Sequence, residues 1–254
     1  MTRNLLDLTG KHIFIAGGSR GIGAAAARMA AEAGAAVSLT YQSNRDAADR
    51  VVAEVQEVGG KAIAIQSEIS DPVFIKQAVE ESVHQLGPLS GLVVSAGIFE
   101  GCPIDEMTAE FWDRTMAINV RGTFLAVQAV ARHMRATGGS IVIYTSTAGQ
   151  RGSAVYSAYS TSKAAQIMFM RSMALELAPN RIRVNCIAPA WTETDMAAPS
   201  LDELGRESVA RNVPLGRIGL PDDVAGATCY LLSDLSAFIT GSTITVDGGA
   251  DMRG

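Results

Sequence analysis

Short apolar runs alternate along the chain with longer segments of helical periodicity. The runs predicted as strands are His12–Ala16, Val37–Tyr41, Lys61–Gln66, Gly91–Ala96, Ser140–Thr145, Arg183–Ile187 and Thr243–Val246. The helices expected between them are Gly21–Ala33, Asp46–Val58, Pro72–Leu86, a long helix within Ala109–Arg135, Ala154–Leu177 and Asp222–Leu232. Continuously apolar strands that alternate with helices are typical of parallel sheets covered on both faces. The sequence therefore predicts an α/β fold with a doubly wound, seven-stranded parallel sheet and helices on both faces.

No linker-like stretch, composition break or internal repeat divides the chain, so residues 1–254 are expected to form one domain. One segment departs from the alternation. Residues 189–217 are polar and contain prolines, and a short helix is expected near Leu201–Arg211. Because long insertions in compact domains often serve as lids, we expect this segment to cover a substrate.

Charge and composition argue against several classes of function. The chain has 21 Lys+Arg and 26 Asp+Glu residues, a net charge of −5 and no basic run, which argues against nucleic-acid binding. Its three histidines and three cysteines lack metal-ligand spacing, so we expect free thiols and no metal site. Met1–Lys11 shows no signal-peptide pattern and no apolar segment has membrane-spanning length, so we expect a cytoplasmic protein without a membrane partner.

The first predicted strand runs directly into a glycine-rich turn, and a helix follows. Glycine lets the backbone turn tightly and approach a phosphate closely, and a helix N-terminus offers free N–H groups to a pyrophosphate. In the first unit of a β-α-β series, such a turn indicates a Rossmann fold with a dinucleotide site. The residues expected to form it are Gly17, Ser19, Arg20, Gly21, Ile22 and Gly23.

The end of the second predicted strand bears on which dinucleotide binds. An NAD site commonly has a carboxylate there for the ribose 2′-hydroxyl, whereas this chain reads Tyr41-Gln42-Ser43-Asn44-Arg45. Arg20 and Arg45 suit a 2′-phosphate, helped by the Ser43 hydroxyl and the Asn44 amide. We therefore expect NADP(H) rather than NAD(H). The alternative is that both arginines are solvated surface charges.

Tyr159 and Lys163 lie four residues apart in a predicted helix and therefore on one face of it. A nearby ammonium, together with a positive nicotinamide ring, lowers the pKa of a phenol and suits Tyr159 to exchange a proton with a substrate oxygen. Tyr156 has no such lysine partner.

Ser146 follows the fifth predicted strand, where side chains point into the ligand crevice of open α/β sheets. On position alone, the hydroxyl that binds the substrate oxygen could equally be that of Thr145 or Thr147.

Together these motifs resemble those of the classical short-chain dehydrogenase/reductase family, from about Leu8 to Gly249. The resemblance implies a catalytic tetrad of Asn119, Ser146, Tyr159 and Lys163. It also implies that NADPH delivers a hydride to a carbonyl carbon while Tyr159 protonates the oxygen and Ser146 orients it. Lys163 would hold the nicotinamide ribose, and Asn119 would anchor a water chain that resupplies protons.

The same resemblance implies further cofactor contacts beside the glycine turn. They are Tyr41, Glu68, Ile69, Ser95, Ala96, Gly97, Tyr159, Lys163, Pro189, Thr192 and Thr194. The chain departs from the family at Val94-Ser95-Ala96-Gly97, where Asn-Asn-Ala-Gly is usual, and at Ala190, where glycine is usual. Neither departure touches proton or hydride transfer, so we expect an active enzyme.

Within the family, the motifs are most similar to those of 3-oxoacyl-(acyl-carrier-protein) reductases and related NADPH carbonyl reductases. We expect the substrate to be a 3-oxoacyl thioester or a small ketone. The side chains expected near it are Gln150, Arg151, Tyr156, Trp191 and Met196. The family's carrier-docking arginines are missing, although Arg135 and Arg181 lie close to those positions. One alternative is a sugar or polyol dehydrogenase of the same family, and a more distant one is a non-catalytic NADP-sensing or scaffold protein.

Charged residues make up only 19% of the chain, against roughly 25% in an average soluble domain. Helices with more than one apolar face are expected to be covered. The family pairs its two long helices, here within Ala109–Arg135 and Ala154–Leu177, across subunits. The resemblance therefore implies a homotetramer.

Overall fold

All seven strands form and pair in parallel, in the order β3-β2-β1-β4-β5-β6-β7. The computed structural model describes residues 6–252. Its strands are β1 His12–Ala16, β2 Ala36–Tyr41, β3 Lys61–Gln66, β4 Gly91–Val94, β5 Gly139–Tyr144, β6 Ile182–Pro189 and β7 Thr243–Val246. The winding reverses between β1 and β4, which is where open α/β sheets leave a ligand crevice. The predicted doubly wound sheet is confirmed.

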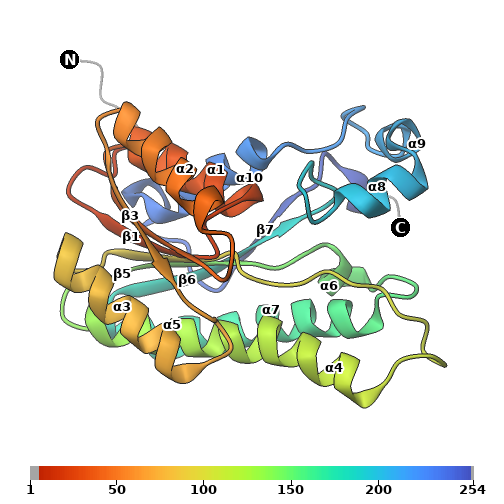
Figure 1. Cartoon of the computed structure of the whole chain (residues 1–254), viewed down its shortest axis with the longest axis horizontal. Helices are drawn as coiled ribbons and strands as arrows, with labels where there is room; N and C mark the ends of the chain where they lie inside the picture. Colours follow the sequence, from red (N-terminus) through yellow and green to blue (C-terminus); the bar gives the residue numbers. More distant parts are fainter. Residues whose placement is uncertain (1–5, 253–254) are drawn as a thin grey trace.

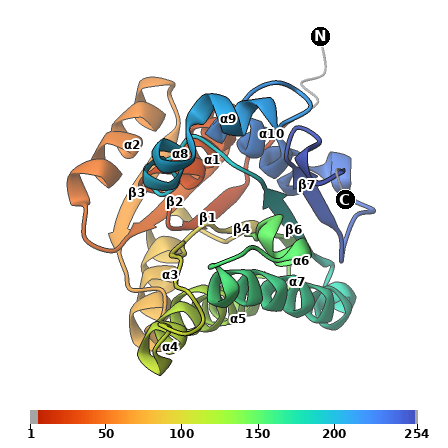
Figure 2. The same cartoon turned by 90° about the vertical axis from the view of Figure 1, so that its right-hand side faces the viewer.

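Helices cover both faces of the sheet (Figures 1 and 2). One face carries α1 Gly21–Glu32, α2 Arg45–Glu57 and α10 Pro221–Leu232; the other carries α3 Pro72–Leu86, α5 Gly122–Met134 and α7 Ser157–Leu177. Each face has its own apolar core, one built around Ile13, Ile15 and Val37 and the other around Phe14, Leu92 and Ile143. Neighbouring residues of one strand thus enter opposite cores, so the buried strands are mostly apolar, with buried polar exceptions such as Ser38 and Asn185.

Two expected helices are interrupted. The long helix expected within Ala109–Arg135 consists of α4 Ala109–Met116, a π-helical turn at Ala117–Arg121, and α5. The insertion carries two short helices, α8 Ala198–Leu204 and α9 Arg206–Arg211, instead of one. Gly205 separates them with a φ of 77°, a conformation that a helix cannot continue through.

The remaining short elements lie mostly at turns. They are α6 Ala148–Arg151 and the 3₁₀ turns Ala178–Asn180, Asp234–Ser236 and Ala250–Met252. Helices α6, α8 and α9 gather at one end of the molecule, to the right in Figure 1. Within residues 6–252, no helix combines the length and apolar character needed to cross a membrane.

Candidate active site

A cleft of about 380 Å³ opens along the carboxyl edge of the sheet. Gly17, Ser95, Thr145 and Ala190 line it, and each of them directly follows the end of a strand. The crevice is therefore formed where parallel strands end and their connections diverge, as expected for an open α/β sheet.

Most of the side chains predicted from the sequence meet in this cleft. They are Gly17, Ser19, Arg20, Gly21, Ile22, Tyr41, Glu68, Ile69, Ser95, Ala96, Gly97, Ser146, Arg151, Tyr156, Tyr159, Lys163, Pro189, Trp191, Thr192, Thr194 and Met196. The predicted residues that do not line it are Gly23, Ser43, Asn44, Arg45, Asn119 and Gln150.

The glycine turn is too tightly packed for side chains. A Cβ atom on Gly17 would lie 2.6 Å from the Ala96 nitrogen, and Gly17 has a φ of 83°. A Cβ atom on Gly23 would lie 2.2 Å from the Gly17 oxygen, so Gly23 acts behind the turn rather than in the cleft. The first turn of α1 carries no acidic side chain, and its free N–H groups favour an anion. These residues fit the phosphates of a dinucleotide.

Two residues after β2 that were expected to bind a 2′-phosphate, Asn44 and Arg45, have partners within the chain instead. The Asn44 carboxamide oxygen accepts a hydrogen bond from the Ala47 nitrogen at 3.0 Å and thereby caps α2. The Arg45 guanidinium pairs with the Asp49 carboxylate at 3.3 Å on the surface of α2. Arg20 lines both the main cleft and an adjoining cavity of about 340 Å³. Of the two arginines expected at a 2′-phosphate, Arg20 is the one that faces the cleft.

Lys163 is a buried cation, with 6% of its surface exposed. Its Nζ donates a hydrogen bond to the Tyr144 carbonyl oxygen at 2.9 Å and lies 5.6 Å from the centre of the Tyr159 ring. Burial disfavours the charged form and lowers the pKa of Lys163 to about 8. Helix α6 packs against this part of α7 so closely that a Cβ on Gly149 would lie 2.7 Å from the Lys163 backbone.

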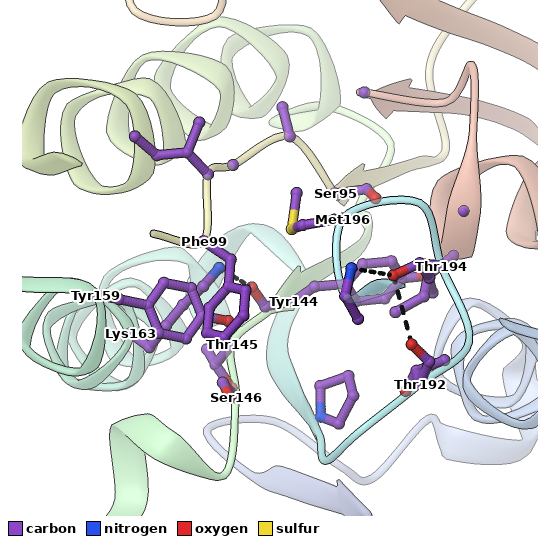
Figure 3. Close-up of a pocket in the computed structure, with 18 of the residues that line it drawn as sticks. Ser95, Phe99, Tyr144, Thr145, Ser146, Tyr159, Lys163, Thr192, Thr194 and Met196 are labelled. Atoms are coloured by element: carbon purple, nitrogen blue, oxygen red, sulfur yellow. Dashed lines mark hydrogen bonds between the residues drawn. The ribbon is translucent and has the colours of Figure 1, made fainter. Parts of the chain in front are cut away.

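Tyr159 projects from α7 beside Lys163, above Ser146 (Figure 3). Burial raises its pKa to about 12, and a hydrogen bond with Ser146 offsets only part of that rise. The pKa of Tyr159 in the protein therefore moves opposite to the direction expected from the Tyr159–Lys163 spacing, because burial disfavours the charged phenolate. The Ser146 hydroxyl oxygen also accepts a hydrogen bond from the Ala148 nitrogen at 3.1 Å.

Asn119 lies fully buried behind the cleft, in the π-helical turn. Its Oδ1 accepts a hydrogen bond from the Ile98 nitrogen at 2.8 Å, and its Nδ2 donates to the Ile98 oxygen at 3.0 Å. Nδ2 also donates to the Ser162 hydroxyl at 3.0 Å. The Asn119 carbonyl accepts from Thr123 at 2.7 Å and from Gln166 at 2.8 Å. Asn119 therefore clamps the loop that follows β4 to helix α7.

Phe99 was not among the predicted site residues, although it lines the cleft and contacts Tyr159 edge-on at 4.9 Å between ring centres. It is the first aromatic residue after the Ala96-Gly97 turn, which is the signal that would have identified it. Gln150, in contrast, is exposed beside Thr245. Arg135 and Arg181 precede β5 and β6 and so lie at the opposite edge of the sheet from this cleft.

A family model described as Enoyl-(Acyl carrier protein) reductase matches residues 16–251. The structure of a dehydrogenase/reductase from Sinorhizobium meliloti 1021 superposes with a TM-score of 0.91 and 40% identity, over 97% of each chain. The chain belongs to the short-chain dehydrogenase/reductase family.

Relatives of this short-chain dehydrogenase/reductase act on varied substrates. Versicolorin reductase 1 of Aspergillus parasiticus is 37% identical over 96% of this chain and 97% of its own. The L-rhamnose 1-dehydrogenase (NAD(P)(+)) of Sphingomonas sp. is 36% identical over 95% and 96%. The 3-oxoacyl-[acyl-carrier-protein] reductase of Synechocystis sp. is 36% identical over 96% and 98%. The family thus establishes an oxidoreductase that uses a nicotinamide cofactor and leaves several substrate classes open.

The tight contact between α6 and α7 predicts that Gly149→Ala destabilises this short-chain dehydrogenase/reductase. The added methyl would meet backbone atoms of Lys163 and Ala164, so the helices must move apart. We expect a loss of about 1–3 kcal/mol in the free energy of unfolding, measured by urea denaturation. Gly226→Ala is the matched control, because it lies within α10 with no heavy atom within 4 Å of the new methyl. That variant should gain about 0.5–1 kcal/mol. Equal effects of the two substitutions would contradict the packing argument.

Proposed function

We propose that this chain is an NADP(H)-dependent oxidoreductase that interconverts a carbonyl compound and its secondary alcohol. The observation that carries the proposal is the meeting of Ser146, Tyr159 and the buried Lys163 at one end of a cleft whose other end suits a dinucleotide. We propose that the cofactor contacts those predicted cofactor residues that line the cleft. Four further predicted cofactor residues do not line it and would act next to it: Gly23, Ser43, Asn44 and Arg45.

The chemistry divides between the cofactor and the chain. When bound, the reduced nicotinamide supplies a hydride to the carbonyl carbon. Tyr159 donates its phenolic proton to the carbonyl oxygen, so that the ketone gains one hydride and one proton and becomes an alcohol. Ser146 donates a hydrogen bond to the same oxygen and orients it. The phenolate left on Tyr159 then takes a proton from solvent.

Lys163 makes this proton transfer feasible near neutral pH. The reverse reaction needs the Tyr159 phenolate to take the proton of the alcohol, and a pKa of about 12 leaves very little phenolate near neutral pH. The Lys163 ammonium 5.6 Å from the Tyr159 ring favours the phenolate, and a positively charged oxidised cofactor adds to that effect. Lys163 would also hold the nicotinamide ribose. We further propose that Asn119 positions the loop at Ile98; its part in a proton-supplying water chain stays a prediction.

The substrate would enter beneath the insertion, residues 189–217, which contributes Trp191, Met196 and the short helices α8 and α9. A small ketone or a 3-oxoacyl thioester fits the proposed chemistry. A carrier protein is less well supported, since Arg135 and Arg181 lie at the far edge of the sheet in the same chain. A sugar or polyol remains the alternative substrate, because a relative is named as an L-rhamnose 1-dehydrogenase.

We propose that four copies assemble through the outer faces of α5 and α7. Phe124, Met168 and Leu175 expose 40%, 58% and 81% of their surfaces there, and such apolar exposure favours a covered interface.

We also propose that the protein is cytoplasmic. The three cysteines are free thiols, which supports that expectation.

Replacing Tyr159 by phenylalanine tests the proposed acid. The variant keeps the ring and its packing but lacks the proton, so kcat for ketone reduction should fall by about 10²–10⁴-fold. NADPH binding, followed by fluorescence titration, should stay within twofold of wild type. Tyr230→Phe, on the remote helix α10, is the control and should retain full activity. Undiminished turnover in Tyr159→Phe would contradict the assignment, whereas NADPH binding without turnover of any ketone by the wild type would favour the sensor alternative.

Replacing Arg20 by methionine tests the choice of cofactor. If Arg20 binds the 2′-phosphate, loss of its charge should raise KM for NADPH by about 10- to 100-fold and leave KM for NADH nearly unchanged. Lys76→Met, on the exposed surface of α3, controls for the change in net charge. Equal effects of Arg20→Met on both cofactors would contradict a 2′-phosphate contact.

Light scattering tests the assembly. At micromolar concentration we expect a mass of four times the 26.6 kDa chain. Leu175→Lys places a charge on the exposed face of α7 and should shift the mass towards dimers or monomers. A monomeric wild-type protein would contradict the proposal.

A further inference from the structure

Three aromatic side chains from three separate loops form one wall beside Tyr159. The Phe99 and Tyr156 rings stack with 4.5 Å between their centres and 4° between their planes. The Trp191 ring meets Phe99 edge-on at 5.9 Å and 83°. Phe99 follows β4, Tyr156 precedes α7 and Trp191 follows β6, so chain segments distant in sequence converge here. We call Phe99, Tyr156 and Trp191 the aromatic wall; Figure 3 shows Phe99 next to Tyr159.

One cation at this end of the cleft is held in an ion pair. The Arg151 guanidinium pairs with the Asp251 carboxylate at 2.9 Å, which neutralises the cation that would otherwise suit a carboxylate substrate. Asp195 and Arg20 both line the main cleft and the second cavity. Next to Tyr159, the Lys163 ammonium is hydrogen-bonded to the Tyr144 carbonyl oxygen. With Arg151 and Lys163 both engaged, the substrate end of the cleft favours an uncharged molecule.

The hydroxyl groups around the aromatic wall are also engaged. The Tyr156 hydroxyl lies 3.2 Å from the Ser200 hydroxyl of α8. The Thr192 hydroxyl donates to the Ala190 oxygen at 3.1 Å, and the Thr194 hydroxyl oxygen accepts from the Ala197 nitrogen at 3.2 Å. A sugar or polyol brings many hydroxyls, and burying them without partners costs binding free energy. This wall offers few partners to them.

We propose that the substrate is an uncharged ketone whose carbonyl is attached to, or part of, a flat conjugated ring, with its alcohol as product. The inference rests on the proposed function and narrows its substrate class. The carbonyl oxygen binds at Ser146 and Tyr159 while the ring packs against the aromatic wall. Such stacking or edge contacts favour a flat ring over a puckered ring of the same size by about three- to tenfold.

Two ketones that differ in ring flatness test the proposal. Acetophenone and cyclohexyl methyl ketone have the same methyl carbonyl and a six-membered ring, but only the first ring is flat. In Phe99→Leu we expect kcat/KM for acetophenone to fall about three- to tenfold more than kcat/KM for cyclohexyl methyl ketone. Phe74→Leu, an exposed residue of α3, is the control and should leave both values unchanged.

A binding measurement separates this inference from the proposed activity. In a Trp112→Phe background, Trp191 is the remaining tryptophan and reports on the aromatic wall. With NADPH present, which cannot oxidise an alcohol, 1-phenylethanol should change the Trp191 fluorescence at concentrations three- to tenfold lower than 1-cyclohexylethanol.

The outcomes distinguish the two proposals. Preferential binding of the aryl alcohol without turnover of either ketone would overturn the proposed function and leave the wall as an aryl-binding site. Turnover of both ketones with an equal loss in Phe99→Leu would overturn the aryl preference and leave the activity. Oxidation of L-rhamnose with a higher kcat/KM than that of 1-phenylethanol would also overturn the proposed preference for aryl substrates.

Discussion

The contact between the Lys163 ammonium and the Tyr144 carbonyl is the interaction on which the rest of the site depends. A buried cation is costly unless it is paired or hydrogen-bonded, and here an oxygen at the end of β5 accepts from it at 2.9 Å. Strand β5 lies inside the sheet, between β4 and β6, and Tyr144 pairs with Ile187 of β6. The position of the Lys163 ammonium beside Tyr159 is therefore fixed by a strand of the sheet rather than by a flexible loop.

Two residues in the helices around Lys163, Gly149 and Asn119, allow this lysine to be buried. Gly149 lets α6 approach the backbone of α7 at Lys163 without a side chain between them. On the other side, Asn119 binds both the nitrogen and the oxygen of Ile98 and also the Ser162 hydroxyl. Asn119 lies in the π-helical turn, a kind of irregularity that is frequent at functional sites. The same clamp holds Phe99 in place, so the buried cation and the aromatic wall share their support.

Sequence periodicity was sufficient to predict the strands, their parallel arrangement and the edge that carries the site. Those features follow from local patterns: apolar runs, the glycine turn after β1 and the hydroxyl after β5. Other features depend on tertiary contacts. Asn44 caps α2 and Arg45 pairs with Asp49, because each has a local partner that competes with a ligand. The pKa of Tyr159 depends on how much water reaches the phenol, which the spacing to Lys163 does not reveal. The aromatic wall joins three distant loops, so no short stretch of sequence contains it.

The central claim is that the Lys163 charge, together with the bound cofactor, lowers the high pKa of Tyr159 enough for proton exchange. Its most direct test is the pH dependence of kcat for alcohol oxidation at saturating NADP⁺, in the wild type and in Lys163→Met. Oxidation needs the Tyr159 phenolate, so kcat should rise with pH and level off above the pKa of Tyr159 in the complex. We expect that midpoint below 10.0, the usual value for a phenol, in the wild type. Lys163→Met should move it upwards by about 1–3 pH units, since a nearby positive charge is removed. Superimposable profiles for the two proteins would contradict the account.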